Sequence, residues 1–105
     1  KEDSMDPITL NAVIFEEEGI WIAQCLEYNL VSCAETLNEL PGELMRQVRT
    51  QIEADQRAGN APFFAYQPAA PRFWAMYDEA KLRSVPILPE ESIPSVRAQL
   101  FQIAA

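Results

Sequence analysis

The first third of the chain alternates between segments that favour β-strands and short turn signals. Residues 8–15 (ITLNAVIF) and 20–26 (IWIAQCL) are rich in β-branched, aliphatic and aromatic side chains, as strands are. The segment EEEG at 16–19 ends in a glycine that can adopt a positive φ, so it indicates a tight turn. Residues 29–34 (NLVSCA) form a third predicted strand. Together these segments predict a three-stranded antiparallel meander.

Both faces of this predicted sheet carry apolar side chains. Within the second strand, Trp21 and Cys25 share one face, whereas Ile20 and Ile22 share the other. The first strand is likewise apolar on both sides. Such a sheet must be covered on both faces, and one helix can cover only one of them. We therefore expect the C-terminal segment or another protein to cover the second face.

A long amphipathic helix follows the meander. Its buried stripe repeats every four residues and consists of Leu40, Leu44, Val48 and Ile52. Thr36 and Glu39 fit a T-x-x-E capping box, but Pro41 is tolerated only if the regular helix starts later, so that it falls in the first turn. We expect a loose first turn from Thr36, a regular helix from about Glu39, and an end near Arg57, before Gly59.

The C-terminal half contains two more predicted elements. Residues 61–71 (APFFAYQPAAP) form an extended connector whose aromatic side chains should lie on a neighbouring apolar surface. Residues 71–82 predict a second, short helix that begins at a proline and has Phe73, Met76 or Tyr77, and Ala80 on its inner face. Residues 84–95 contain three prolines and form a loop. A final strand at 96–103 should pair with the meander.

These elements predict an α+β fold of order β-β-β-α-α-β. It consists of a three-stranded antiparallel meander plus a C-terminal strand, one long helix packed on one face, and a second short helix. A length of 105 residues indicates a single domain, 1–105. No apolar run approaches the ~20 residues of a membrane span, and the start KEDSMDP lacks the apolar stretch of a signal peptide. Met5 is a candidate natural start, which would leave four residues outside the native chain.

The charge is strongly acidic. Sixteen acidic residues against eight basic ones give a formal net charge of −8, which argues against direct nucleic-acid binding because phosphate contacts need clustered Lys and Arg. An acidic surface suits a basic protein partner, since complementary charge speeds encounter. The alternative interpretation is that the charge only keeps the protein soluble.

The inventory of reactive side chains is short. The chain has no histidine, three glycines, and neither a G-x-S-x-G nor a phosphate-binding glycine motif. Cys25 and Cys33 are interpreted as buried free thiols, which is typical of a reducing, cytoplasmic compartment. Glu90 and Glu91 lie in the proline-rich loop and are expected to be solvated. We expect no enzyme activity, no cofactor and no metal site; a catalyst would need convergent carboxylates and a metal ion.

The stretch IFEEEGIWIAQCLEYNLVSCAETLNEL resembles the core of HicB-like antitoxin domains. These domains show a hairpin with a G-[YW]-[VI]-A pattern, a short segment leading to a third strand, and then a G-[DE/K]-T-x-[DE]-E-A motif that starts a helix. The matching positions are Gly19, Trp21, Ile22, Ala23, Leu26, Glu35, Thr36, Leu37 and Glu39. The resemblance covers roughly the core at 8–57 and leaves 61–105 as a family-variable C-terminal extension. The chain departs from the pattern at Ala34, where the family has glycine, and at Leu40, where it has alanine.

The resemblance implies a partial ribonuclease H-like fold and a role in neutralising a small basic RNA-cleaving toxin. The candidate partner-binding residues are Glu16, Glu17, Glu18, Trp21, Glu27, Tyr28 and Glu35. The carboxylates would attract the toxin, and the two aromatic residues would be apolar anchors. Burial under the C-terminal segment is the alternative interpretation of Trp21. No DNA-binding tail is evident, because residues 61–105 contain only four basic side chains and no recognition helix.

An alternative is an orphan module with the same fold and no toxin partner. It would form a homo-oligomer through the second sheet face or the final strand. It could also bind a small ligand in an aromatic pocket near Phe63, Tyr66 and Trp74.

Overall fold

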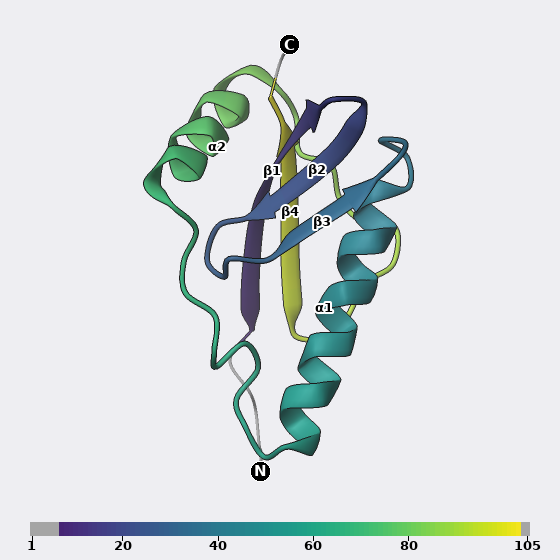
Figure 1. Ribbon diagram of the computed structural model, residues 1–105, viewed down its shortest axis with the longest axis vertical. Helices are drawn as coiled ribbons and strands as arrows, with labels where there is room; N and C mark the ends of the chain where they lie inside the picture. Colours follow the sequence, from purple (N-terminus) through teal and green to yellow (C-terminus); the bar gives the residue numbers. More distant parts are fainter. Residues whose placement is uncertain (1–6, 104–105) are drawn as a thin grey trace.

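A computed structural model describes residues 7–103, so the candidate start Met5 lies outside the described range. The elements are β1 (Ile8–Glu17), β2 (Ile20–Cys25), β3 (Val31–Ala34), α1 (Leu40–Arg57), α2 (Pro71–Arg83) and β4 (Val96–Gln102). This order confirms the α+β prediction. The strands form one sheet in the order β3-β2-β1-β4 (Figure 1). The meander of β1, β2 and β3 is antiparallel as predicted, whereas β4 runs parallel to β1, so the sheet is mixed.

The β1–β2 hairpin is tighter than the sequence indicated. Strand β1 continues through Glu16 and Glu17, so only Glu18 and Gly19 form the turn. Both turn residues have positive φ, 52° at Glu18 and 83° at Gly19. Two residues with positive φ form the kind of turn whose twist matches that of the flanking strands. The hairpin therefore presents its acidic residues at the end of a regular ladder.

Helix α1 packs against β2 and β3 and covers one face of the sheet. The predicted stripe is confirmed, with Ile52 partly buried and the other three side chains fully buried. They meet the buried face of the other strands, which includes Leu10, Ile14 and Leu100. This cluster is the main hydrophobic core.

The ends of α1 follow the predicted signals within one residue. The helix begins at Leu40, which places Pro41 in its first turn, where no backbone donor is needed. One turn earlier, Thr36 Oγ1 accepts the backbone N–H of Glu39 at 3.3 Å and donates to its carboxylate. At the other end Gly59 takes φ 80°, and its N–H donates to the carbonyl of Gln56.

Helix α2 covers half of the opposite face. It packs on β1 and β4, where Tyr77 and Ala80 are buried beside Val13 and Phe101. Figure 1 shows α1 and α2 on opposite sides of the sheet. The C-terminal segment therefore supplies the cover that the apolar second face requires, but only over β1 and β4.

The β2–β3 half of this second face stays open. Ile20 and Val31 are 38% and 43% exposed, and Cys33 beside them is also exposed. The prediction that both cysteines are buried is thus wrong for Cys33. Its side chain lies on the side of β3 away from α1, where no element of the described chain covers it. Cys25 lies in the α1-side core.

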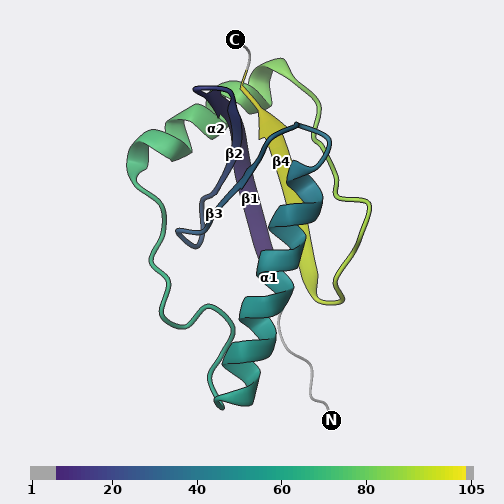
Figure 2. The ribbon, with the colours of Figure 1, turned by 45° about the vertical axis from the view of Figure 1, so that its right-hand side comes forward.

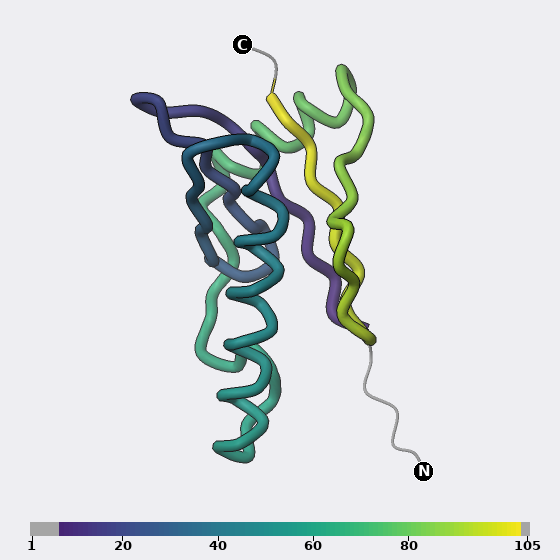
Figure 3. The backbone as a smooth tube through the Cα atoms, turned by 90° about the vertical axis from the view of Figure 1, so that its right-hand side faces the viewer, coloured from purple at the N-terminus to yellow at the C-terminus, as the bar shows by residue number. Residues whose placement is uncertain are grey.

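The connector at 61–71 and the loop at 84–95 both pack on the rest of the fold. In the connector, Phe63 is buried in the core with φ 62° and stacks on Tyr28 at 4.7 Å between ring centroids. Its backbone N–H donates to the Asp55 carboxylate at 2.7 Å. The loop at 84–95 runs along the outer edge of β4, as Figures 2 and 3 show. There Ile87 exchanges two backbone hydrogen bonds with Leu100.

Candidate functional site

One end of the sheet collects acidic side chains from separate parts of the chain. The pairing register places Glu16 beside Trp21 and Trp21 beside Ala34, so these residues form one row across three strands. The exposed hairpin tip with Glu17 and Glu18 lies beyond this row. The turn that leads from β3 into α1 begins at the same end (Figure 1) and adds carboxylates of its own.

The carboxylates of this turn are favoured there by the start of α1. Glu39 is exposed and directly precedes the first residue of α1, whereas the exposed Glu35 lies five positions before it. The first turn of a helix has unpaired N–H groups and a partial positive charge, which stabilise nearby anions. The acidic composition of this turn is therefore compatible with local folding as well as with binding.

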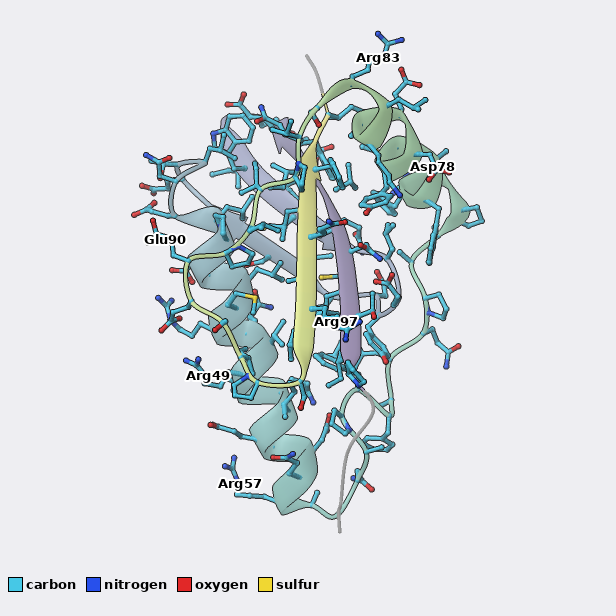
Figure 4. All side chains as sticks on the ribbon, turned by 180° about the vertical axis from the view of Figure 1, so that it is seen from behind. Arg49, Arg57, Asp78, Arg83, Glu90 and Arg97 are labelled. Atoms are coloured by element: carbon cyan, nitrogen blue, oxygen red, sulfur yellow. The ribbon has the colours of Figure 1, made fainter. Side chains whose placement is uncertain are left out.

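A groove beside the turn brings in a third acidic segment. It has a volume of about 560 Å³ and lies between the start of α1 and the loop at 84–95. Its lining is Leu37, Asn38, Pro41, Gly42, Ile87, Leu88, Glu90 and Glu91. Figure 4 shows Glu90 beside the first turns of α1. The lining of the groove thus combines apolar side chains with two carboxylates.

We call this region the acidic end and define it by Glu16, Glu17, Glu18, Glu35, Glu39, Glu90 and Glu91 together with the groove. The nearest ion pair joins Arg49 Nη1 and the Glu91 carboxylate at 3.8 Å, and both side chains are largely exposed. The positive charge of Arg49 offsets one of the seven carboxylates that define the acidic end. The acidic end therefore presents a strong negative field to solvent.

Trp21 lies at the boundary between core and acidic end. It is half-buried and packs against the α1-side core cluster, which also includes Leu37 and Ile87 of the groove. The interpretation that Trp21 is buried under the C-terminal segment stays a prediction, because its partial burial is accounted for by packing on the α1-side cluster. Its remaining exposed surface is available to a partner.

Two candidate residues lie elsewhere. Glu27 and Tyr28 follow β2, at the opposite end of the strand from the hairpin tip. The Glu27 carboxylate accepts the backbone N–H and the side-chain amide of Asn11 at 2.8 and 2.6 Å. The Tyr28 ring stacks on Phe63. Both residues therefore make internal contacts, and the structure does not bring them together with Glu16, Glu17, Glu18, Trp21 and Glu35.

The aromatic pocket considered for a small ligand does not form. Phe63 is only 2% exposed and fills the core, with its ring edge against Tyr66. Trp74 is on α2 and donates its indole N–H to the carbonyl of Ala69 at 3.2 Å. Phe63 and Tyr66 therefore pack on each other, and Trp74 makes a separate contact.

Among residues 7–103, no three carboxylate, thiol or imidazole groups converge as a metal ion would require. The two thiols lie on opposite faces of the sheet. Burial, with a contribution from Glu27, raises the pKa of Cys25 to about 12. In the same range no helix is long and apolar enough to cross a membrane.

Sequence reasoning missed the groove. The sequence pattern places Leu37, Pro41 and Ile87 in a turn, a helix start and a loop, and it predicts only solvated side chains for Glu90 and Glu91. The available signal was the combination of Ile87 and Leu88 with two glutamates in one loop. The sequence does not show that this loop runs along β4 and past the start of α1.

Neither a protein-family model, nor a curated protein, nor a solved structure matches this chain.

Proposed function

We propose that the protein is a non-catalytic binding module of the HicB-like antitoxin type, which neutralises a small basic RNA-cleaving toxin. The observation that carries this proposal is that acidic segments gather at one end of the sheet, where two of them, the β3–α1 turn and the loop at 84–95, line a groove. The segments are the hairpin tip, the β3–α1 turn and the loop at 84–95. No single stretch of the sequence contains this surface.

The surface combines two features that a tight, specific complex needs. Exposed carboxylates steer a basic partner toward the acidic end and fix its orientation. The apolar groove offers Leu37, Pro41 and Leu88 to a side chain of the partner, and Leu88 is 63% exposed in the free protein. Burial of such apolar area supplies affinity that exposed charges alone do not.

The fold supports the same interpretation. A three-stranded meander backed by one long helix is the arrangement that the sequence resemblance implies. The residues that carry the resemblance include Trp21, Glu35 and Glu39, which lie at or beside the acidic end. The absence of histidine from the sequence and the solvent-exposed position of these carboxylates favour binding rather than catalysis.

Co-expression with the product of the adjacent gene tests this function. If that product is a small basic protein, we expect it to inhibit growth when expressed alone, and co-expression to restore growth. The two proteins should co-purify at low salt and separate progressively as salt increases. Growth inhibition that persists despite full expression of this protein would contradict the proposal.

A variant set shows which surface is responsible. The substitutions Glu16→Gln, Glu17→Gln and Glu18→Gln together should weaken rescue. The matched control removes three exposed charges elsewhere, with Glu53→Gln, Asp78→Asn and Glu79→Gln, and should rescue like the wild type. Equal loss in both variants would indicate that only net charge matters.

A further inference from the structure

The chain covers the β4 edge of the sheet with a further segment but leaves the β3 edge open. At the β4 edge, Ile87 pairs with Leu100 through two backbone hydrogen bonds. Beyond the other end of the meander, Asn29 N–H donates to the carbonyl of Gln67 in the connector at 2.6 Å. Strand β3 itself forms the other edge of the sheet and has no neighbouring strand on its outer side within residues 7–103. Unpaired edges are templates for another strand.

The alternation of hydrogen-bonded and non-bonded pairs between β2 and β3 shows which backbone N–H and C=O groups of β3 face outward. Cys25 N–H donates to the carbonyl of Leu30, and the pairing register continues through Ala23 opposite Ser32. Bonded and non-bonded pairs alternate along an antiparallel ladder, so Ser32 and Ala34 point their backbone groups toward β2. Val31 and Cys33 consequently direct theirs to the open edge. Within residues 7–103 one contact reaches them, from Gln47 Nε2 to the Val31 carbonyl at 3.1 Å.

Ser32 provides an independent observation at the same place. Its side chain is 2% exposed, and its Oγ is the buried side-chain polar atom that has no hydrogen-bond partner in the described chain. A buried hydroxyl without a partner is destabilising, so such a group calls for an explanation, for example a contact that is missing. This hydroxyl lies in the middle of the open edge strand.

We propose that a second copy of this chain pairs with β3 in antiparallel fashion, around a two-fold axis at Ser32. Val31 of each copy then lies opposite Cys33 of the other, and their outward backbone groups exchange hydrogen bonds. Ser32 lies opposite Ser32 of the second copy in a non-bonded pair, whose Cα atoms are about 4.5 Å apart. Because the Ser32 hydroxyl is enclosed on the α1 side of the single chain, a rotation about χ1 in each copy is needed to bring the two hydroxyls within bonding distance, as in cross-strand Ser and Thr pairs.

The distribution of charge favours a second copy at this edge. The α1 side chains beside it include Glu43 and Arg46, which form an ion pair at 2.7 Å, and the uncharged Gln47 and Thr50. This surface is close to neutral, although the chain carries a net charge of −8. Two copies therefore meet here without the like-charge repulsion that the acidic end would produce. A basic partner is drawn instead to the acidic end.

Sedimentation equilibrium on the full chain tests the pairing. The wild type should reach twice the chain mass of 11.9 kDa as concentration rises. The Val31→Lys/Cys33→Lys variant places lysines directly opposite each other in both cross-strand pairs and should stay monomeric. The matched control, Phe64→Lys/Leu82→Lys, puts two lysines on exposed apolar positions in the connector and on α2, away from the edge, and should dimerise like the wild type. Circular dichroism establishes that both variants are folded.

A disulfide tests the register without removing contacts. Directly opposite residues have Cα atoms about 5.5 Å apart, within the range for a disulfide, whereas the diagonal distance between the two native Cys33 residues is about 7–8 Å. Mild oxidation should therefore link two chains of the Val31→Cys variant much faster than those of the wild type. A monomeric wild type, a monomeric control variant, or equal cross-linking would each overturn the proposal.

This proposal does not depend on the proposed function. Self-association is measured without any partner, and the edge variant retains the acidic end. A dimer that fails to bind a basic protein would contradict only the antitoxin role, and a monomer that binds one would contradict only the pairing through β3.

Discussion

The Glu27 carboxylate binds Asn11 through both of its oxygens. One oxygen accepts the backbone N–H at 2.8 Å and the other accepts the side-chain amide at 2.6 Å. This contact continues the β1–β2 ladder beyond its last regular pair, where Leu26 N–H donates to the Asn11 carbonyl. The Asn11 amide oxygen in turn accepts the Tyr77 hydroxyl at 2.9 Å. Glu27 thus joins β1 to the β2–β3 turn, and through Asn11 to α2.

Replacement of Glu27 by glutamine should therefore lower the free energy of unfolding, and it should have little effect on the affinity for a partner. A glutamine can accept only one of the two hydrogen bonds, and its own N–H₂ group faces the Asn11 amide, so we expect a loss of about 1–3 kcal/mol in the free energy of unfolding. Urea denaturation measures it. The control Glu53→Gln, on an exposed part of α1, should change stability by less than about 0.5 kcal/mol. An unchanged urea midpoint for Glu27→Gln would contradict the assignment.

The two thiols should differ sharply in reactivity. The pKa of Cys25 is raised to about 12 by burial, with a contribution from Glu27, so its reactive thiolate is scarce, whereas Cys33 is exposed. In dilute native protein at about pH 8, a thiol reagent should label one site per chain, and Cys33→Ser should abolish that labelling. The second site should react only in denaturant. Rapid native labelling of Cys25 would show that the core is open.

Stability should decline at alkaline pH because of Tyr77. Burial and the carboxylates of Glu27 and Asp78 raise the pKa of Tyr77 above its ordinary value of 10.0. Above that pH the unfolded chain ionises this phenol first, so unfolding is favoured as pH rises until the folded pKa is passed. The Tyr77→Phe variant should be less stable near neutral pH by about 0.5–1.5 kcal/mol, but its stability should fall less steeply above pH 10.0. Parallel pH curves for the two proteins would contradict this assignment.

The Asp55 carboxylate should stabilise the start of the connector. It is buried, and it accepts the N–H of Phe63 and the side-chain amide of Gln51. Asp55→Ala leaves the Phe63 N–H buried without an acceptor, at a residue whose φ is already positive, so we expect a loss of about 1–3 kcal/mol. Gln56→Ala, at an exposed neighbouring position, is the control and should change stability little. Thermal unfolding measures both, and equal melting temperatures would exclude the role of Asp55.

Local sequence signals predicted most of the elements. The four-residue spacing of Leu40, Leu44 and Val48 predicted the buried face of α1, and Gly59 marked its end. The apolar character of both sheet faces correctly indicated a cover from the C-terminal segment. These features depend on neighbours in sequence or on the two-residue period of a strand.

Long-range placement was harder to predict. Nothing in residues 96–102 specifies that this strand runs parallel to β1, which follows from the long crossover through α1 and α2. The exposure of Cys33 depends on how far α2 extends across the sheet, which a strand pattern does not contain. In the candidate site, Glu16, Glu17, Glu18, Trp21 and Glu35 lie at one end as expected of a meander. The chemistry of Glu27 and Tyr28 groups these residues with that set, but the length of strand β2 separates them from it.

The affinity for a basic partner, measured against ionic strength, tests the central claim most directly. The partner is the basic protein encoded beside this one, titrated by calorimetry into the wild type, the Glu16→Gln/Glu17→Gln/Glu18→Gln variant and the Glu53→Gln/Asp78→Asn/Glu79→Gln control. At low salt the hairpin-tip variant should bind about tenfold more weakly, or about 1.4 kcal/mol, and its affinity should depend less on salt. The control should match the wild type. Wild-type affinity in the hairpin-tip variant, or no binding by any of the three proteins, would contradict recognition through the acidic end.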